Sequence, residues 1–431
     1  MKLKEMPRLF LTLVFIFSVT STSMALAMAS ETLCENFGDQ LLKVSDTFKG
    51  GTDTFAVATD NDLLYEWYDE FHNEQSKHCL WSATKTVTAI LVGVAILQEK
   101  ISLDTKVEQI IPFNRTIAPN QKNYALNYSK LTIRDLLTMS SGFAWNESVG
   151  DKLWDSSILK MLYMGHMQDV ASSVLATPFY EEREAKSWNY STGDFVLLSL
   201  ILKTIYKDQP RYPWDLLFDR LQMKNVTFEQ DESGTYLGGS HLFLTTRDLI
   251  KIGQLLLNRG VWKGARIFPA WWIDFMANVS PGVWKMSRHS ELLKDEWKNG
   301  VYGGGIWTNK SMPAITPLLP SMPDSTFLAI GVFGQYIVVS PEDRLVVVRT
   351  GHDQVSGVPL QECKKRSIFP PAISKIIKMV KISNYSRGES RPLYRLEIAP
   401  TVLSYLTVVA KSPAAYASYD PEHPERGCTL D

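Results

Sequence analysis

Two groups of strand-like segments, one toward each end of the chain, constrain its fold most strongly. Residues 54–70 (TFAVATDNDLLYEWYDE) have the pattern of two strands joined by an Asp-Asn-Asp turn. Residues 325–351 (STFLAIGVFGQYIVVSPEDRLVVVRTG) have the pattern of three strands, the last two joined by the turn SPED. Segments so far apart bury their apolar faces most simply in one antiparallel sheet.

Between the two strand groups, apolar residues recur at helical spacing. Residues 132–141, 193–206 and 245–260 show this spacing, and residues 33–48 and 371–380 predict a helix near each end. The sequence therefore predicts an α/β fold of the α+β type, with an antiparallel sheet flanked by terminal helices and a mainly helical lobe from the middle of the chain. A cleft is expected between the sheet and the lobe.

The chain ends indicate export and a three-part organisation. Residues 1–29 combine a basic start, an apolar run over residues 9–19 and small residues at the end, as in a signal peptide. A membrane anchor is the alternative, but the run is shorter than the roughly 20 residues that span a bilayer. We expect a periplasmic or secreted protein without a stable membrane anchor, with residues 30–386 as one domain and residues 387–431 as a Pro-rich polar tail.

Charge and cysteine content limit the partners. The net charge of −1 offers no basic field for nucleic acid, so a small-molecule substrate is expected. No C-x-x-C or H-E-x-x-H motif occurs and the histidines are scattered, so neither a metal nor a cofactor is predicted. The sequence leaves the oligomeric state open, and three disulfide pairings remain possible for Cys34, Cys79, Cys363 and Cys428.

A serine and a lysine stand at the start of a long apolar segment, residues 80–97 (LWSATKTVTAILVGVAIL). The run from Thr86 to Leu97 predicts a helix buried nearly all round, with Ser82 at its positive N-terminal end. Lys85 would lie one turn further on the same face, where a half-buried amine loses its charge and can act as a base. Ser82 and Lys85 are therefore candidates for a nucleophile and its activating partner.

The S-x-x-K pattern alone does not decide between catalysis and structure. Ser82 could be a helix N-cap and Lys85 a surface residue with a buried stem. A second copy, Ser157 with Lys160, has no other mark of a site. The flanking sequence has to distinguish the two interpretations.

The flanks resemble the serine β-lactamase-like hydrolases, in particular the branch of class C β-lactamases, family VIII carboxylesterases and 6-aminohexanoate-dimer hydrolase. The similar segments are residues 80–112 around Ser82, then LTIRDLLTMSSGFAW, WNYSTGDFVLLSLIL, GGSHLFLTTRDLIKIGQLLLNRGVWKGARIFPAWW and YGGGIW, in that order. The resemblance extends from Phe55 to Thr350 and is more specific than any single motif. It implies a β-lactamase/transpeptidase-like fold.

The resemblance implies catalytic roles for three residues. Ser82 is the nucleophile, Lys85 its activating partner and Tyr190 the second acid/base, with a nearby lysine ammonium favouring the phenolate form of Tyr190. Taken alone, Tyr190 could be a core tyrosine, since Tyr128-Ser129 and Tyr385-Ser386 are equally short matches.

Several positions of the resemblance concern the substrate. Thr192 stands where many members have Asn, so the amide contact that such an Asn makes to the substrate is in doubt. Arg349-Thr350-Gly351 imitates the third family motif but ends a later strand; the equivalent place is LAIGVFGQ, which lacks the cationic residue. There the backbone N–H of Val332 would form an oxyanion hole with the N–H of Ser82. The missing charge argues against a β-lactam carboxylate.

The sequence thus predicts an exported serine hydrolase that cleaves carboxylic esters or small linear amides through an acyl-enzyme, without a cofactor. Trp145, Trp188 and Trp307 suit an apolar acyl or alcohol group, although packing is their commoner role. A β-lactamase or a peptidase specific for D-amino acids is the alternative within the family, and a non-catalytic binding protein is the alternative outside it. A Ser-His-Asp hydrolase would need a G-x-S-x-G elbow, and the sequence has none, so His241 is interpreted as structural.

Overall fold

The computed structural model describes residues 52–147, 155–164, 167–180, 187–285, 301–312, 317–320 and 322–352. The predicted signal peptide, both predicted terminal helices and the predicted tail lie outside these ranges, as do Cys34, Cys363 and Cys428. Cys79 forms no disulfide. In the described part of the chain, no helix combines the length and the apolar character needed to cross a bilayer.

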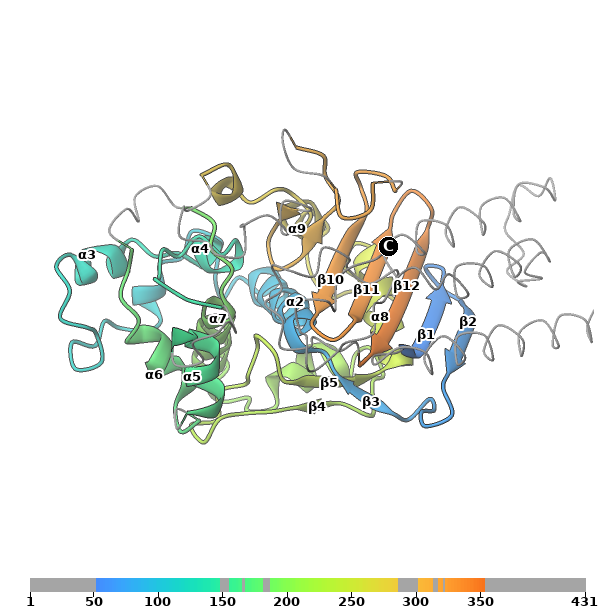
Figure 1. Ribbon diagram of the computed structural model, residues 1–431, viewed down its shortest axis with the longest axis horizontal. Helices are drawn as coiled ribbons and strands as arrows, with labels where there is room; N and C mark the ends of the chain where they lie inside the picture. The colour runs from blue at the N-terminus through green and yellow to red at the C-terminus, as the bar shows by residue number, and fades with distance from the viewer. Residues whose placement is uncertain are drawn as a thin grey trace, which may run out of the picture.

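One antiparallel sheet joins the two strand groups that the sequence predicts (Figure 1). Within the described residues it has seven strands in the order β2-β1-β12-β11-β10-β9-β8. Strand β1 (Thr52–Ala58) pairs with β12 (Leu345–Gly351), and Phe55 lies opposite Arg349. The other strands of this sheet are β2 (Leu63–Tyr68), β8 (Val301–Tyr302), β9 (Trp307–Thr308), β10 (Phe327–Gly331) and β11 (Gln335–Ser340). The predicted sheet from distant parts of the chain is confirmed.

Helix α8 (Thr246–Leu257) packs on β1, β11 and β12. Its N-cap Thr245 accepts a hydrogen bond from the backbone N–H of Asp248 (3.2 Å), which satisfies one of the first-turn donors. The apolar face of this helix comes close to the sheet at Gly253, where an added Cβ would lie 2.3 Å from Val346 Cγ1. Glycine at this position therefore permits the helix–sheet contact.

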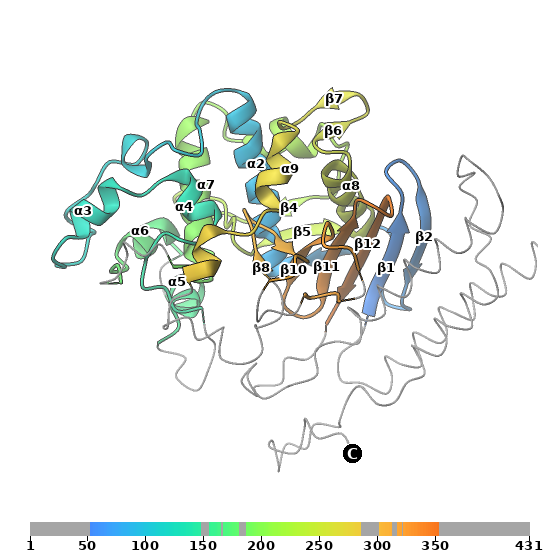
Figure 2. The same ribbon diagram turned by 90° about the horizontal axis from the view of Figure 1, so that it is seen from above.

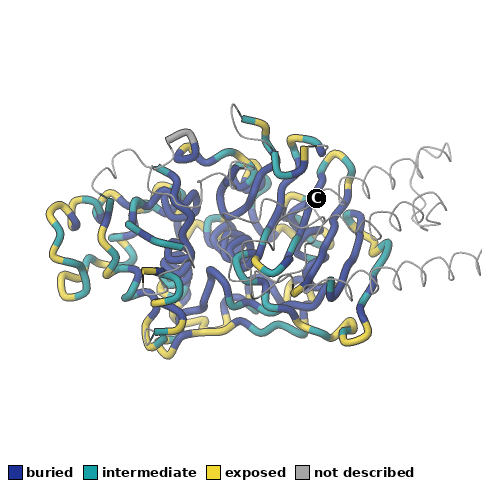
Figure 3. Tube along the Cα trace, viewed as in Figure 1, coloured by how far each residue is buried: buried dark blue, intermediate teal, exposed yellow. Residues whose placement is uncertain are grey.

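Helix α2 (Thr84–Leu97) lies between the sheet and the helical lobe, as Figures 1 and 2 both show. It is buried from Thr84 to Ala95 and packs against α7 (Thr192–Ile205) and β10. Figure 3 shows this burial continuing through the sheet and the central helices. The predicted helical lobe is confirmed.

Shorter elements complete the described structure. The further helices are α3 (Tyr124–Ser129), α4 (Ile133–Leu137), α5 (Ser157–Tyr163), α6 (Val170–Leu175) and α9 (Trp271–Met276). Short 3₁₀ or π turns occur at η1 (Trp81–Ala83), η2 (Val107–Gln109), η5 (Trp214–Phe218) and η6 (Pro281–Lys285). Small sheets are formed by β3 (Lys77–Cys79), β4 (Thr227–Phe228) and β5 (Leu242–Thr245), and by β6 (Val261–Trp262) and β7 (Ala265–Arg266).

Candidate active site

Ser82 lies in a tight turn between β3 and α2. The preceding Leu80 donates its N–H to the carbonyl of Leu242 (2.8 Å), and Trp81 then adopts a left-handed φ of 47°. This φ is uncommon for a large side chain. The ring of Trp81 packs edge-on against Phe333 at 5.3 Å, a contact that helps to hold the turn.

The helix N-terminus differs in detail from the prediction. The sequence predicts the helix from Thr86, but α2 begins at Thr84 and the 3₁₀ turn η1 precedes it. Ala83 is the N-cap, so the alternative in which Ser82 serves as the cap is wrong. The 3₁₀ turn leaves the side chain of Ser82 partly exposed, a position from which it can meet a substrate.

Lys85 is more buried than predicted. Its side chain is 1% exposed, and its Nζ donates to Ser82 Oγ (3.1 Å), Thr192 Oγ1 (2.8 Å) and the carbonyl of Gly239 (2.8 Å). Burial lowers the pKa of the Lys85 ammonium to about 8, although the negative charge of Glu147 acts in the opposite direction. With this pKa, roughly a tenth of the amine is uncharged at pH 7, beside a hydroxyl.

Tyr190 lies next to this pair. Nζ of Lys85 is 5.0 Å from the centre of the Tyr190 ring, and the phenol shares a hydrogen bond with Ser82. The following Ser191 is the N-cap of α7, where its Oγ accepts from the N–H of Asp194 (3.0 Å), so the helix start fixes the position of Tyr190. The structure thus brings Ser82, Lys85 and Tyr190 together.

The surroundings of Tyr190 favour its neutral form over the phenolate that a lysine charge alone would favour. Burial is the largest cause of a pKa above the ordinary value for this phenol, and the charge of Glu147 adds to the rise; the hydrogen bond with Ser82 opposes it only in part. The sequence argument considered the lysine charge alone. A raised pKa suits Tyr190 to the role of a proton donor.

Glu147 is a member of the site that sequence reasoning missed. Its carboxylate accepts hydrogen bonds from the N–H of Thr192 (3.0 Å), from the Thr192 hydroxyl and from the Trp145 indole. The Thr192 hydroxyl therefore accepts from Lys85 and donates to Glu147, which connects a carboxylate to the lysine. Glu147 comes 45 residues before Thr192 and belongs to no local motif, so only the fold reveals the contact.

The end of strand β10 lies against the nucleophile turn. A Cβ added to Gly331 would be 2.1 Å from the carbonyl oxygen of Leu80, so the two backbones touch here. Val332 follows directly, with its side chain 42% exposed. The proximity of the segments agrees with an oxyanion hole formed by the N–H groups of Ser82 and Val332, which stays a prediction.

Other residues match the catalytic motifs in sequence, but those that the structure describes have structural roles. Ser157 begins α5, where its Oγ accepts from the N–H of Asn146 (3.0 Å), and Lys160 is exposed. Tyr128 is buried and donates to the carbonyl of Ile111 (2.8 Å), while Tyr385 lies outside the described residues. Arg349 is on β12, which β11 separates from β10.

The three tryptophans are core residues. Trp145, Trp188 and Trp307 are all buried, and Trp307 stacks on the ring of Tyr190 at 5.9 Å. Trp188 meets the same ring edge-on at 6.1 Å. Trp188 and Trp307 thus pack on the ring of Tyr190, which agrees with the commoner role of such residues in packing.

The site can be compared with known proteins. The 6-aminohexanoate-dimer hydrolase of Paenarthrobacter ureafaciens is 20% identical over 301 residues, which are 63% of this chain and 73% of that protein. A Bacillus anthracis protein named as a candidate 6-aminohexanoate-dimer hydrolase shares the fold with a TM-score of 0.57 and 18% identity, over 81% of this chain and 83% of that chain. The hydrolase EstCE1 does so with a TM-score of 0.56 and 15% identity, over 77% and 96%.

The family assignment rests on a broader match than these pairs. The beta-lactamase family model matches residues 45–366, which include the whole of the site described above. Both solved structures show the predicted β-lactamase/transpeptidase-like fold over most of the chain. The chain therefore belongs to the beta-lactamase family.

Proposed function

We propose that the protein is a serine hydrolase that cleaves carboxylic esters or small linear amides through an acyl-enzyme. The observation that carries this proposal is the buried Lys85 amine, 3.1 Å from the Ser82 hydroxyl and with its pKa lowered to about 8. A base with a pKa near the working pH is effective in proton transfer. The names of two relatives agree: one hydrolyses 6-aminohexanoate dimers, and EstCE1 is a hydrolase with promiscuous acyltransferase activity.

In the proposed acylation step, Ser82 Oγ attacks the substrate carbonyl while its proton passes to uncharged Lys85 Nζ. The carbonyl π electrons move to oxygen, where the N–H groups of Ser82 and Val332 stabilise the negative charge. Removal of one such donor typically costs about 10²–10³-fold in rate. The tetrahedral intermediate then collapses and the bond to the leaving group breaks.

Tyr190 completes the proton transfers. Its neutral phenol donates a proton to the leaving alkoxide or amine, and its hydroxyl oxygen recovers one from the Lys85 ammonium, whose Nζ is 5.0 Å from the ring centre. A water molecule then attacks the acyl-enzyme by the same sequence, with Lys85 again as the base. The acid product leaves and Ser82 regains its proton.

The substrate preference follows from the turn after β10. This turn carries Val332 and Phe333 where a β-lactam carboxylate would need a cation. We expect p-nitrophenyl butyrate to be hydrolysed with a kcat/KM roughly 30–150-fold above that for nitrocefin, because a lost charge-assisted contact costs about 2–3 kcal/mol. Steady-state rates on both substrates test this preference. Faster nitrocefin cleavage would assign the protein to the β-lactamase activity, and turnover of neither substrate would favour a binding role.

The pH dependence of ester hydrolysis should report Lys85. Because the uncharged amine is the base, kcat/KM should rise with pH through an apparent pKa of about 8. Glu147 stabilises the lysine ammonium, so Glu147→Gln should move this rise to lower pH, by roughly half to one unit. A pH profile of kcat/KM for each protein measures both effects.

The control for Glu147 is Glu232→Gln, the same substitution at an exposed position. Its pH profile should match the wild-type profile, since screened surface charges act weakly over distance. If Glu147→Gln lowers the rate without moving the rise, its carboxylate orients Thr192 but does not tune Lys85. If kcat/KM of the wild type does not rise with pH in this range, Lys85 is not the base.

A further inference from the structure

A second group of chemically active side chains includes His78 of strand β3, the strand that leads into the nucleophile turn. Three of the four histidines in the described part of the chain (His72, His78, His352) gather around Asp53 of β1. His78 belongs to β3, and His72 belongs to the turn that follows β2. One atom each from Asp53, His72 and His78 lies within 4.8 Å of the other two.

His78 is buried without adequate hydrogen bonds. It is 8% exposed, and among the described residues neither of its ring nitrogens has a hydrogen-bond partner of acceptable geometry. Its Nε2 lies 3.2 Å from Asp53 Oδ2, close enough for electrostatic attraction. A buried polar atom left in this state is destabilising, by about 1–3 kcal/mol as a rule. A further partner for this ring would remove that cost.

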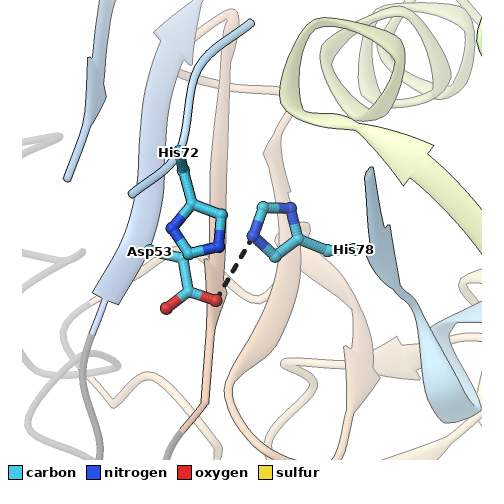
Figure 4. A group of neighbouring side chains, drawn as sticks. All are labelled: Asp53, His72 and His78. Atoms are coloured by element: carbon cyan, nitrogen blue, oxygen red, sulfur yellow. Dashed lines mark ion pairs between the residues drawn. The ribbon is translucent and has the colours of Figure 1, made fainter. Parts of the chain in front are cut away.

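His72 faces the same space. Its ring centre is 4.9 Å from that of His78, and Figure 4 shows that each ring directs a nitrogen toward the other ring, beside the Asp53 carboxylate. Nδ1 of His72 is held by Asp69 Oδ1 at 2.6 Å, which leaves Nε2 for this space. The second oxygen of Asp53 pairs with His352.

These contacts have the organisation of a metal site. Metal-binding histidines generally engage their other ring nitrogen with a carboxylate, which orients the ring, and Asp69 does this for His72. Two imidazole nitrogens and one carboxylate oxygen suit Zn²⁺, whose ligands at about 2.0–2.1 Å lie roughly 3.4 Å apart in a tetrahedron. Side-chain shifts of about 1 Å would bring the three atoms to this spacing.

We propose that Asp53, His72 and His78 bind one Zn²⁺ ion, with Asp69 and His352 orienting the ligands. The ion would satisfy Nε2 of His78, which has no hydrogen bond of acceptable geometry among the described residues. It would also fasten β3, which leads into the nucleophile turn, to strand β1 of the main sheet. This site is separate from the proposed chemistry at Ser82, and Zn²⁺ takes part in no step of that reaction.

The test measures the metal directly. Protein without a histidine tag is stripped with EDTA and titrated with ZnCl₂ in competition with a chromophoric chelator. We expect one Zn²⁺ per chain, a rise in Tm of about 3 °C or more with saturating metal, and an affinity at least roughly 100-fold lower in His78→Gln. His241→Gln, which removes a histidine outside the group, should bind as the wild type does.

The proposal is overturned if the wild type binds no Zn²⁺, or if His78→Gln and His241→Gln bind it equally. X-ray absorption of the zinc-loaded wild type keeps the test decisive should His78→Gln fail to fold. Two imidazoles with oxygen ligands at about 2.0–2.1 Å would support the site. A sulfur at about 2.3 Å would assign the metal to a cysteine, such as the neighbouring Cys79, and so reject it.

Discussion

Ser82→Ala should lose essentially all ester hydrolysis, with kcat reduced by roughly 10⁴-fold or more, because the nucleophilic hydroxyl is removed. The other hydroxyl beside Lys85, that of Thr192, is buried and donates to Glu147, so it cannot replace Ser82. Ser82 is partly exposed and caps no helix, so its replacement should leave Tm nearly unchanged. Intact mass after treatment with a fluorophosphonate probe should show one adduct on the wild type and none on Ser82→Ala. Together these results would identify the nucleophile.

Ser157→Ala is the matched control, since Ser157 also begins an S-x-x-K pattern. It should keep the adduct and the activity, while the lost hydrogen bond from Asn146 could cost about 1 kcal/mol of stability. Normal turnover in Ser82→Ala would refute the assignment of the nucleophile. An adduct that disappears in Ser157→Ala instead would move the site to α5.

Gly331→Ala should produce the second large loss, a decrease in kcat/KM of roughly 100-fold or more, because misplacement of reacting groups by about 1 Å can cost that much. The new Cβ would lie 2.1 Å from the Leu80 carbonyl oxygen, so β10 and the nucleophile turn must separate. Steady-state kinetics and thermal unfolding of the purified variant measure the effect. Overpacking of this kind also destabilises a fold, by typically about 1–3 kcal/mol.

Gly264→Ala separates this steric effect from a general cost of replacing glycine. A Cβ at Gly264 meets nothing within 4 Å, although its φ of +82° makes the substitution strained. We expect a modest fall in Tm and wild-type activity. If Gly331→Ala is as active as Gly264→Ala, the contact between β10 and the Leu80 carbonyl does not position the site.

Local patterns predicted most of the fold. The apolar runs and the SPED turn correctly predicted β10, β11 and β12, because the pattern of a strand can be recognised from consecutive residues. The two-residue strands β8 and β9 are too short to show a period, and the sequence did not predict them. β9 joins the sheet by pairing with β10, which is a tertiary contact, and β8 joins it by pairing with β9.

The site was predictable where its geometry is local. Ser82 and Lys85 are three residues apart at the start of one helix, so their spacing nearly fixes their contact. The contact of Glu147 with Thr192 joins separate segments. Burial, which is also a tertiary property, raises the pKa of Tyr190, and the charge of Glu147 adds to the rise. The group formed by Asp53, His72 and His78 was missed for the same reason, since its spacing matches no metal-binding motif.

The pairing of β1 with β12 also determines when the protein can fold. Phe55 pairs with Arg349, nearly 300 residues later in the chain, so the central sheet has a high contact order. The loop-closure entropy of this pairing is lost only when β12 joins the sheet. During synthesis, the β1–β2 hairpin emerges early but keeps an unpaired edge until β12 is complete. We therefore expect the described fold to form slowly. Until β12 is synthesised, the free edge of the β1–β2 hairpin can pair with other chains, which favours aggregation.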